Sequence, residues 1–136
     1  MPLLFETRGH IAILTLSRPK ARNAWDEDFN EGLEARLKEL EHNHEIRCVV
    51  LTGDQQGEAF SAGANLADQT THTTESPGTF ITGIPKWRSF AANLLTDFPK
   101  PVIAAVNGYA IGIGCIATYC CASASVQHTD KLRSAT

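Results

Sequence analysis

The chain has 136 residues, of which 43% are hydrophobic, and a formal net charge of −3 at pH 7. This apolar content suits one compact domain and excludes disorder along the whole chain, because disordered chains lack the apolar surface needed to form a core. Twelve Lys and Arg residues against 15 Asp and Glu residues argue against nucleic acid as a partner. No apolar run reaches the about 18 residues of a membrane span, so we predict no membrane association.

A β-hairpin is predicted near the start of the chain. Residues 3–8 and 10–16 are rich in β-forming residues and are separated by Gly9. The second run alternates between two sets of side chains, one of which should face a core. These sets are Ile11, Ile13 and Thr15, and Ala12, Leu14 and Leu16.

An amphipathic helix is predicted to begin near Trp25 and Asp26. The acidic residues at 26–28 would lie at the positive end of the helix dipole. Apolar residues then recur at helical spacing, which indicates one buried face. They are Phe29, Leu33, Leu37 and Leu40, and the solvated face should carry Glu31, Glu34, Arg36, Lys38, Glu39 and Glu41.

Two short apolar runs predict further strands. Residues 48–52 form a continuous run of the kind found in strands covered on both faces, and residues 102–106 are predicted as a second buried strand. Between them we expect a surface loop at 68–82 and a helix at 86–97, which a Pro-Lys-Pro sequence ends.

The character of the sequence changes after Cys121. Residues 110–119 predict a helix of small residues, whereas residues 122–136 contain two isolated aliphatic residues and no amphipathic period. We therefore predict a domain over residues 1–121 and an unpacked tail over residues 122–136.

The four cysteines do not follow the spacing of a metal site. None forms a C-x-x-C pair, and most lie in apolar sequence, which is typical of buried, reduced thiols. We therefore predict no metal. With no N-terminal signal pattern, we expect the cytoplasm, with the mitochondrial matrix as the alternative. The cysteines are Cys48, Cys115, Cys120 and Cys121.

Two segments place small residues where an apolar run gives way to a turn or a helix. Residues 59–66 read A-F-S-A-G-A-N-L, and residues 105–115 read A-V-N-G-Y-A-I-G-I-G-C. Small residues there leave backbone N–H groups uncrowded. Two such places indicate an oxyanion site, because fixed N–H donors stabilise a developing negative charge.

Three segments together resemble the enoyl-CoA hydratase/isomerase, or crotonase, family. They are A-G-A-N-L at 62–66, the run from Lys-Pro through Asn-Gly to Gly-Cys at 100–115, and S-R-P-K-A-R-N-A at 17–24, which is similar to the family's R-P-x-x-x-N-A stretch. The resemblance extends from Leu3 to about Cys121. It implies a crotonase-like (ClpP/crotonase) α/β core of repeated ββα units, truncated at its C-terminal side, with sheets roughly perpendicular.

The resemblance implies an acyl-CoA thioester as substrate, with coenzyme A as part of that substrate and no covalently bound cofactor. The thioester oxygen would accept hydrogen bonds from the backbone amides of Ala62 and Ile113, an oxyanion hole that stabilises an enolate. Lys20 and Arg22 would contact the nucleotide phosphates, or else be ordinary exposed basic residues. The full set similar to the family's coenzyme A contacts is Lys20, Ala21, Arg22, Ala24, Gly63, Ala64, Asn65 and Leu66.

This chain departs from the family's pattern at the general acid/base. Hydratases of the family carry a glutamate directly after the Gly-Cys pair, where this chain has Ile116, and a second glutamate further along. An aliphatic side chain cannot transfer a proton, so Ile116 favours isomerase or other acyl-CoA chemistry. Asn65 also stands where aspartate is commoner in the family.

Two functions follow as hypotheses. The first is an acyl-CoA lyase/isomerase of the enoyl-CoA hydratase type in fatty acid or acyl-CoA metabolism, which at full length would form a homotrimer or hexamer. The second is a truncated, catalytically inactive crotonase fragment that acts only as a binding or oligomerising chain. A dinucleotide site in the sequence G-I-G-C-I-A at 112–117 is disfavoured, because several residues separate it from the preceding strand.

Overall fold

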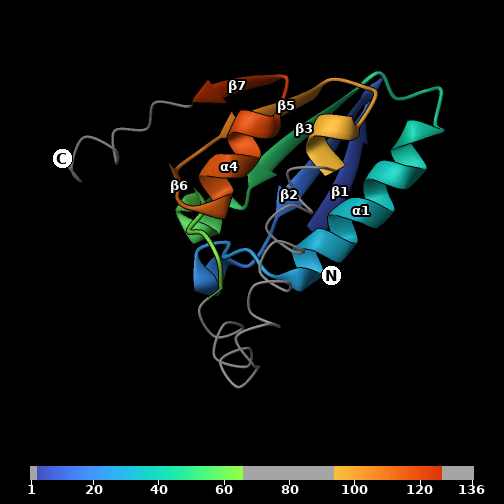
Figure 1. The fold of residues 1–136 in the computed structure, drawn as a ribbon. Coiled ribbons are helices and arrows are strands. Elements are labelled where there is room, and N and C mark those ends of the chain that lie inside the picture. The colour runs from blue at the N-terminus through green and yellow to red at the C-terminus, as the bar shows by residue number, and fades with distance from the viewer. Residues whose placement is uncertain (1–2, 66–93, 127–136) are drawn as a thin grey trace, which may run out of the picture.

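The computed structural model describes residues 3–65 and 94–126. The predicted loop at 68–82 and the first part of the predicted helix at 86–97 lie outside these residues, whereas residues 94–97 are helical. The described elements form a five-stranded sheet, a separate two-stranded sheet, and helices that lie on one face of the larger sheet (Figure 1).

The predicted hairpin is confirmed. Strands β1 (Leu3–Arg8) and β2 (Ile11–Leu16) pair antiparallel, and the chain turns between them at Gly9, which has a φ of 59°. One of the two alternating sets in β2 faces the core. The core-facing residues Ala12, Leu14 and Leu16 are at most 1% exposed.

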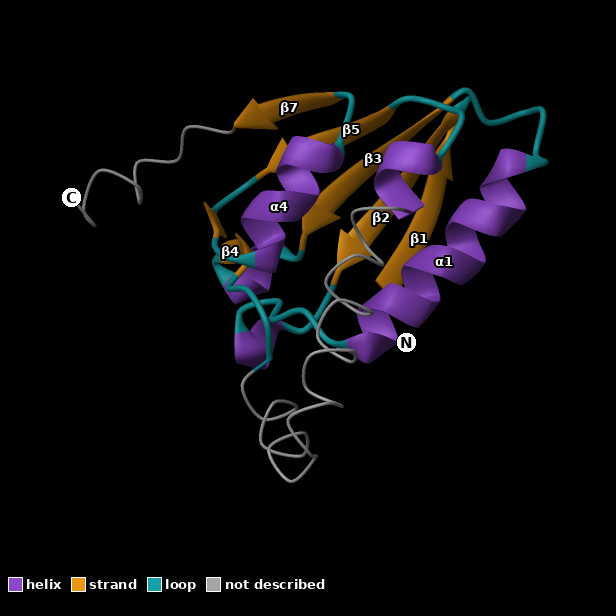
Figure 2. Ribbon diagram, in the orientation of Figure 1, coloured by secondary structure: helices purple, strands orange, loops and turns teal. Residues whose placement is uncertain are grey.

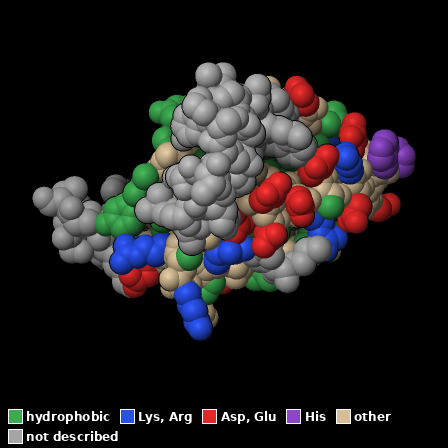
Figure 3. All heavy atoms as spheres, turned by 60° about the horizontal axis from the view of Figure 1, so that its bottom comes forward, with side chains coloured by type: hydrophobic (Ala, Val, Ile, Leu, Met, Phe, Trp, Pro, Cys, Tyr) green, Lys and Arg blue, Asp and Glu red, His purple; other side chains and the backbone are tan. Residues whose placement is uncertain are grey.

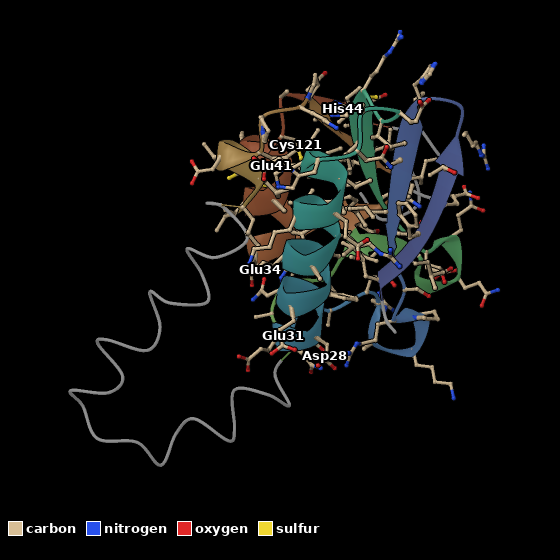
Figure 4. All side chains as sticks on the ribbon, turned by 90° about the vertical axis from the view of Figure 1, so that its right-hand side faces the viewer. Asp28, Glu31, Glu34, Glu41, His44 and Cys121 are labelled. Carbon is tan, nitrogen blue, oxygen red and sulfur yellow. The ribbon has the colours of Figure 1, made fainter. Side chains whose placement is uncertain are left out.

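The predicted amphipathic helix is α1 (Glu27–Glu41). Its N-cap is Asp26, whose side chain accepts a hydrogen bond from the Phe29 N–H at 3.1 Å. This cap satisfies one of the N–H groups that a helix start leaves without a partner. The predicted apolar face is buried, and acidic side chains lie along the helix away from the sheet (Figure 4). The acidic residues labelled there on α1 are Asp28, Glu31, Glu34 and Glu41.

The five-stranded sheet has the order β1-β2-β3-β5-β7. Strands β3 (Cys48–Gly53), β5 (Val102–Val106) and β7 (Ser123–Val126) extend it from the hairpin, and each pairs parallel with the strand before it in this order. Parallel neighbours need long crossover connections. In this chain α1 supplies the connection between β2 and β3.

The prediction that residues 48–52 are covered on both faces is wrong for the described residues. Val49 and Leu51 are fully buried, whereas Val50 between them is only half-buried. The reason is that α1 and α4 (Ile113–Cys120) both lie on the same face of the sheet (Figure 1). The apolar run in the sequence therefore has one core-facing side and one partly exposed side.

The smaller sheet is formed by two strands that each follow a strand of the larger one. Strand β4 (Ala59–Ser61) comes after β3, and β6 (Tyr109–Ala110) comes after β5; β4 and β6 pair parallel. The order β1-β2-α1 and β5-β6-α4 is the expected ββα repeat, and Figure 2 shows β4 and the short helical turns beyond the end of the larger sheet.

Helix α4 begins later than the sequence predicted. Residues 109–110 pair with β4 instead of joining the helix, and Gly112 then turns the chain with a φ of 56°. The helix therefore starts at Ile113 and not near residue 110. Within the described ranges, no helix combines the length and apolar character needed to cross a membrane.

The predicted unpacked tail is wrong for residues 123–126. They form β7, which pairs with β5 from Ile103 opposite Ser123 to Val106 opposite Val126. All four side chains are exposed, so backbone pairing holds the strand without side-chain burial. This explains why the sequence shows no amphipathic period there. The remaining tail, 127–136, lies outside the described residues.

Replacing Asp26 with alanine should lower the free energy of unfolding by about 3 kcal/mol. The change removes the N-cap of α1, worth about 1 kcal/mol, and a charged hydrogen bond to Arg18 at 2.6 Å, worth about 2 kcal/mol. Asp28→Ala is the control, because it removes an exposed partner of the same guanidinium and should cost less than about 1 kcal/mol. Urea unfolding measures both; equal losses would contradict this role of Asp26.

Candidate oxyanion site

The two small-residue motifs meet where β4 and β6 run side by side. The Ile111 N–H donates to the Ser61 carbonyl at 3.0 Å. A Cβ on Gly63 would lie 3.0 Å from the Ile111 carbonyl oxygen, and 3.9 Å from the Cα of Gly112. Residues 61–65 and 111–114 therefore form one unit, which we call the motif junction.

Gly114 lets helix α4 begin directly against β4. A Cβ at this position would lie 2.8 Å from both the Cβ and the carbonyl oxygen of Ser61, closer than such atoms normally approach. Ser61 is fully buried, so it has no space in which to retreat. Because Gly114 has no side chain, the first turn of α4 can lie directly against Ser61, a position that a Cβ would prevent.

A third segment, residues 22–25, runs along the other side of the motif junction. The Ala62 N–H donates to the Arg22 carbonyl at 3.0 Å, the Trp25 N–H donates to the Gly63 carbonyl at 2.7 Å, and the Asn65 N–H donates to the Trp25 carbonyl at 2.8 Å. Trp25 and Ala64 form an isolated parallel bridge. Residues 61–65 are therefore held between segment 22–25 on one side and residues 111–114 on the other.

The hydrogen bonds to segment 22–25 leave the backbone amides of Ala62 and Ala64 in different situations. The Ala62 N–H, a predicted oxyanion donor, already donates to the Arg22 carbonyl. Gly63, with a φ of 95°, interrupts the extended alternation between Ala62 and Ala64. Beyond it, Trp25 bonds to the Gly63 carbonyl and the Asn65 N–H, and because successive N–H groups of an extended segment point to opposite sides, the Ala64 N–H points away from segment 22–25. No acceptor for the Ala64 N–H is found in residues 3–65 and 94–126.

The amide of Ile113, the second predicted donor, is the first of helix α4. Within the same two ranges its N–H has no acceptor, as expected for the first turn of a helix. The partial positive charge of a helix N-terminus favours a negative oxygen nearby. The Ile113 side chain is buried in the core at 6% exposure, so only its backbone is available to a ligand.

The predicted coenzyme A contacts at 20–24 lie on and after a short helical turn, η1 (Pro19–Ala21), that leads into segment 22–25. Lys20 and Arg22 are exposed, and Ala24 is buried. Lys and Arg side chains and a group of acidic side chains share the face shown in Figure 3. Among the contacts at 63–66, Gly63, Ala64 and Asn65 belong to the motif junction, whereas Leu66 lies outside the described residues.

Cys115, Ile116 and Cys121 lie on helix α4, which begins at the motif junction, or at its end, and none of them is suited to move a proton near neutral pH. Ile116 lies on α4 with its aliphatic side chain 46% exposed. Cys115 is half-buried and free. Burial, and to a smaller extent the neighbouring Cys120, raises the pKa of the Cys121 thiol to about 11, so this group stays protonated near neutral pH. The described part of the junction thus offers backbone donors without an acid or base.

Sequence reasoning missed two features of this site. It named Ala64 as a coenzyme A contact but did not consider its amide as a donor. It also gave no role to Asn23, which is fully buried beside the junction. The sequence alone could not separate Ala64 from Ala62, because the directions of their N–H groups depend on the positive φ of Gly63 between them and on which neighbour bonds to the segment.

The comparison with known families decides the classification. The profile described as enoyl-CoA hydratase/isomerase matches residues 6–130. The chain belongs to the enoyl-CoA hydratase/isomerase family. Its fold agrees with that of a solved enoyl-CoA hydratase/isomerase from Xanthobacter autotrophicus, with a TM-score of 0.82 and 26% identity over 93% of this chain and 46% of that one.

Curated relatives within the enoyl-CoA hydratase/isomerase family carry different reactions in their names. A short-chain-enoyl-CoA hydratase of Clostridium acetobutylicum is 36% identical over 83% of this chain and 41% of its own length. A 1,2-epoxyphenylacetyl-CoA isomerase of Escherichia coli is 35% identical over 82% of this chain and 42% of its own length. The chain thus spans about two fifths of the length of these relatives.

Replacing Gly114 with alanine should destabilise the fold by about 2 kcal/mol, because the new methyl group overlaps the buried Ser61. Gly32→Ala is the matched control, since a Cβ there would lie 3.4 Å from the Cβ of Leu3 and the change favours the α1 helix. Thermal unfolding of both variants measures the difference. A Gly114→Ala variant as stable as the wild type would show that Ser61 and Gly114 are not in close contact.

Proposed function

We propose that this chain binds an acyl-CoA thioester at the motif junction and stabilises negative charge on the thioester oxygen, as an acyl-CoA lyase/isomerase of the enoyl-CoA hydratase type. One observation carries the proposal: the amides of Ile113 and Ala64, contributed by the two motifs that meet there, have no acceptor among the described residues. Membership of the enoyl-CoA hydratase/isomerase family supports a thioester as the ligand.

The proposed chemistry needs only backbone groups at this point. Addition, elimination or isomerisation next to a thioester carbonyl develops enolate character, which places negative charge on the carbonyl oxygen. Amides fixed between packed segments stabilise that charge without reorganising. Coenzyme A would extend along segment 20–24, where the exposed Lys20 and Arg22 offer positive charge to its phosphates.

The structure favours Ala64 over Ala62 as the partner of Ile113. The Ala62 N–H would first have to give up its 3.0 Å hydrogen bond to the Arg22 carbonyl, whereas the Ala64 N–H has nothing to exchange among the described residues. We therefore propose Ile113 and Ala64 as the two donors. Ala62 then acts as the link that holds the junction to segment 22–25.

The reaction proposed is isomerase-like, because the position of the hydratase glutamate holds Ile116. A relative named as a 1,2-epoxyphenylacetyl-CoA isomerase is 35% identical to this chain. The proton would be moved by a group outside the motif junction. Assembly into a trimer or hexamer stays a prediction.

A second candidate function is supported by exposed apolar side chains. Tyr119 on α4 is 84% exposed and Val126 on β7 is 67% exposed. Such surface is typical of an interface, so the chain would act by association alone. Sedimentation and acyl-CoA turnover separate the candidates: an inactive oligomer without thioester binding would support the second.

Ile113→Pro should weaken binding of an acyl-CoA thioester by about fivefold. Proline removes the N–H, and one hydrogen bond contributes about 1 kcal/mol, while the first position of a helix tolerates proline. Ile113→Val is the control, because it keeps the amide and nearly the same buried volume, and should bind like the wild type. Calorimetric titration with butyryl-CoA measures both, and unchanged affinity in Ile113→Pro would sink the assignment of this donor.

Backbone ester substitution should separate the two alanine amides. Replacing Ala64 by lactic acid through semisynthesis exchanges its N–H for an oxygen and should weaken thioester binding by about fivefold. The exchange also makes the Gly63 carbonyl, which accepts from the Trp25 N–H, a weaker ester acceptor, so a small loss of stability accompanies it. The same exchange at Ala62 weakens the Ser61 carbonyl as an acceptor in the same way, and should lower stability by about 1 kcal/mol more than the exchange at Ala64, because it also removes the hydrogen bond to the Arg22 carbonyl. The reverse pattern would restore Ala62 as the donor.

A further inference from the structure

Asn23 is a buried polar residue whose side chain joins three parts of the chain. It is fully buried, and its Nδ2 donates to the Ala59 carbonyl at 2.8 Å and to the Asp54 carbonyl at 3.0 Å. Its Oδ1 accepts from the Arg18 N–H at 2.9 Å. A buried amide with these bonds is costly to disturb, because each lost bond leaves a buried polar group without a partner.

The backbone at this point is also unusual. Arg22 and Asn23 have φ angles of 51° and 56°, in the left-handed region that residues other than glycine rarely adopt. These two residues turn the chain so that the Arg22 carbonyl meets the Ala62 N–H and Trp25 meets residues 63 and 65. Asparagine tolerates this conformation better than most residues, so both its backbone and its side chain suit the position.

The bonds of this turn hold β4 at both of its ends. The Asn23 side chain bonds to Ala59, the first residue of the strand, while Arg22 and Trp25 bond to the segment directly after it. Gly57 also approaches this carboxamide, since a Cβ there would lie only 2.7 Å from the Asn23 Nδ2. The carboxamide is therefore enclosed, and its place determines where segment 22–25 meets the motif junction.

We infer that Asn23 is a positioning residue for the oxyanion site: its carboxamide sets segment 22–25 against β4, and so orients the Ala64 N–H toward the acyl oxygen. The inference rests on the proposed function, because it assigns a role in aligning the proposed donor. Asn23 does not itself contact the substrate. It acts through the three backbone hydrogen bonds between segment 22–25 and residues 62–65.

The test compares two ligands that differ only at the carbonyl. Butyryl-CoA has the thioester oxygen, whereas S-butyl-CoA is the thioether without it, so the ratio of their dissociation constants reports the oxyanion hydrogen bonds alone. Two amides, each worth about fivefold, give an expected preference of about 25-fold for the thioester in the wild type. A residue that only stabilises the fold would leave this ratio unchanged.

Two variants perturb Asn23 in different ways. Asn23→Gly keeps a residue that adopts a positive φ but removes the carboxamide, and should reduce the thioester preference about fivefold. Gly57→Ala leaves Asn23 in place but forces its Nδ2 to move, and should reduce the preference in the same direction by a smaller factor. Leu33→Ala is the control, because it destabilises the core beneath α1 and should leave the ratio at its wild-type value.

The outcomes distinguish this inference from the function on which it rests. A reduced ratio in Asn23→Gly and Gly57→Ala, with Leu33→Ala unchanged, supports the positioning role. A wild-type preference that both variants retain overturns the role of Asn23 and leaves the proposed function standing. A wild type without any thioester preference overturns the proposed function itself. If Asn23→Gly does not fold at 4 °C, Gly57→Ala alone decides the question.

Discussion

The contact between Ser61 and Gly114 is the constraint on which the candidate site depends. Two backbones approach there more closely than any side chain would allow, so the first turn of α4 begins directly against β4. The hydrogen bond from Ile111 to Ser61 and the close approach of Gly63 to the same turn then hold the two motifs together. A site assembled in this way has little freedom to adjust, which is the condition under which backbone dipoles stabilise a charge effectively. Because the proposed chemistry at position 113 uses only the backbone N–H, the Ile113 side chain is free to pack in the core.

Much of the fold followed from periodicity. The hairpin, the helix over 27–41 and the strand at 102–106 were predictable because burial of one face imposes a period of two or of 3.6 on the apolar residues. Strand 123–126 could not be predicted in this way. Its side chains are all exposed, so its stability comes from backbone pairing with β5, which leaves no trace in the pattern of residue types. The prediction that residues 48–52 are covered on both faces failed for a related reason, because apolar residues also occupy the partly exposed face of this strand.

The sequence was enough to predict which segments form the candidate site, but not which backbone amides within them face a ligand. The motifs at 59–66 and 105–115 indicated which parts of the chain would meet, and the structure brings them together. Which amide faces a ligand depends instead on the bonds that the neighbouring segment 22–25 takes, and these are set by two left-handed residues that no pattern rule identifies. The distinction between Ala62 and Ala64 is therefore a property of three segments at once.

Trp25 connects this site to the interior of the protein. Its backbone bonds to Gly63 and Asn65, while its indole is fully buried, lies 5.9 Å edge-on from the Phe29 ring and donates from Nε1 to the Asn30 side chain at 2.8 Å. One residue thus belongs both to the segment that flanks the candidate donors and to the packed centre of the domain. An indole held in this way emits at short wavelength, and its emission is sensitive to small movements of its surroundings. The chain contains one other tryptophan, Trp87, so a Trp87→Phe variant would isolate Trp25 as a built-in fluorophore beside the candidate site.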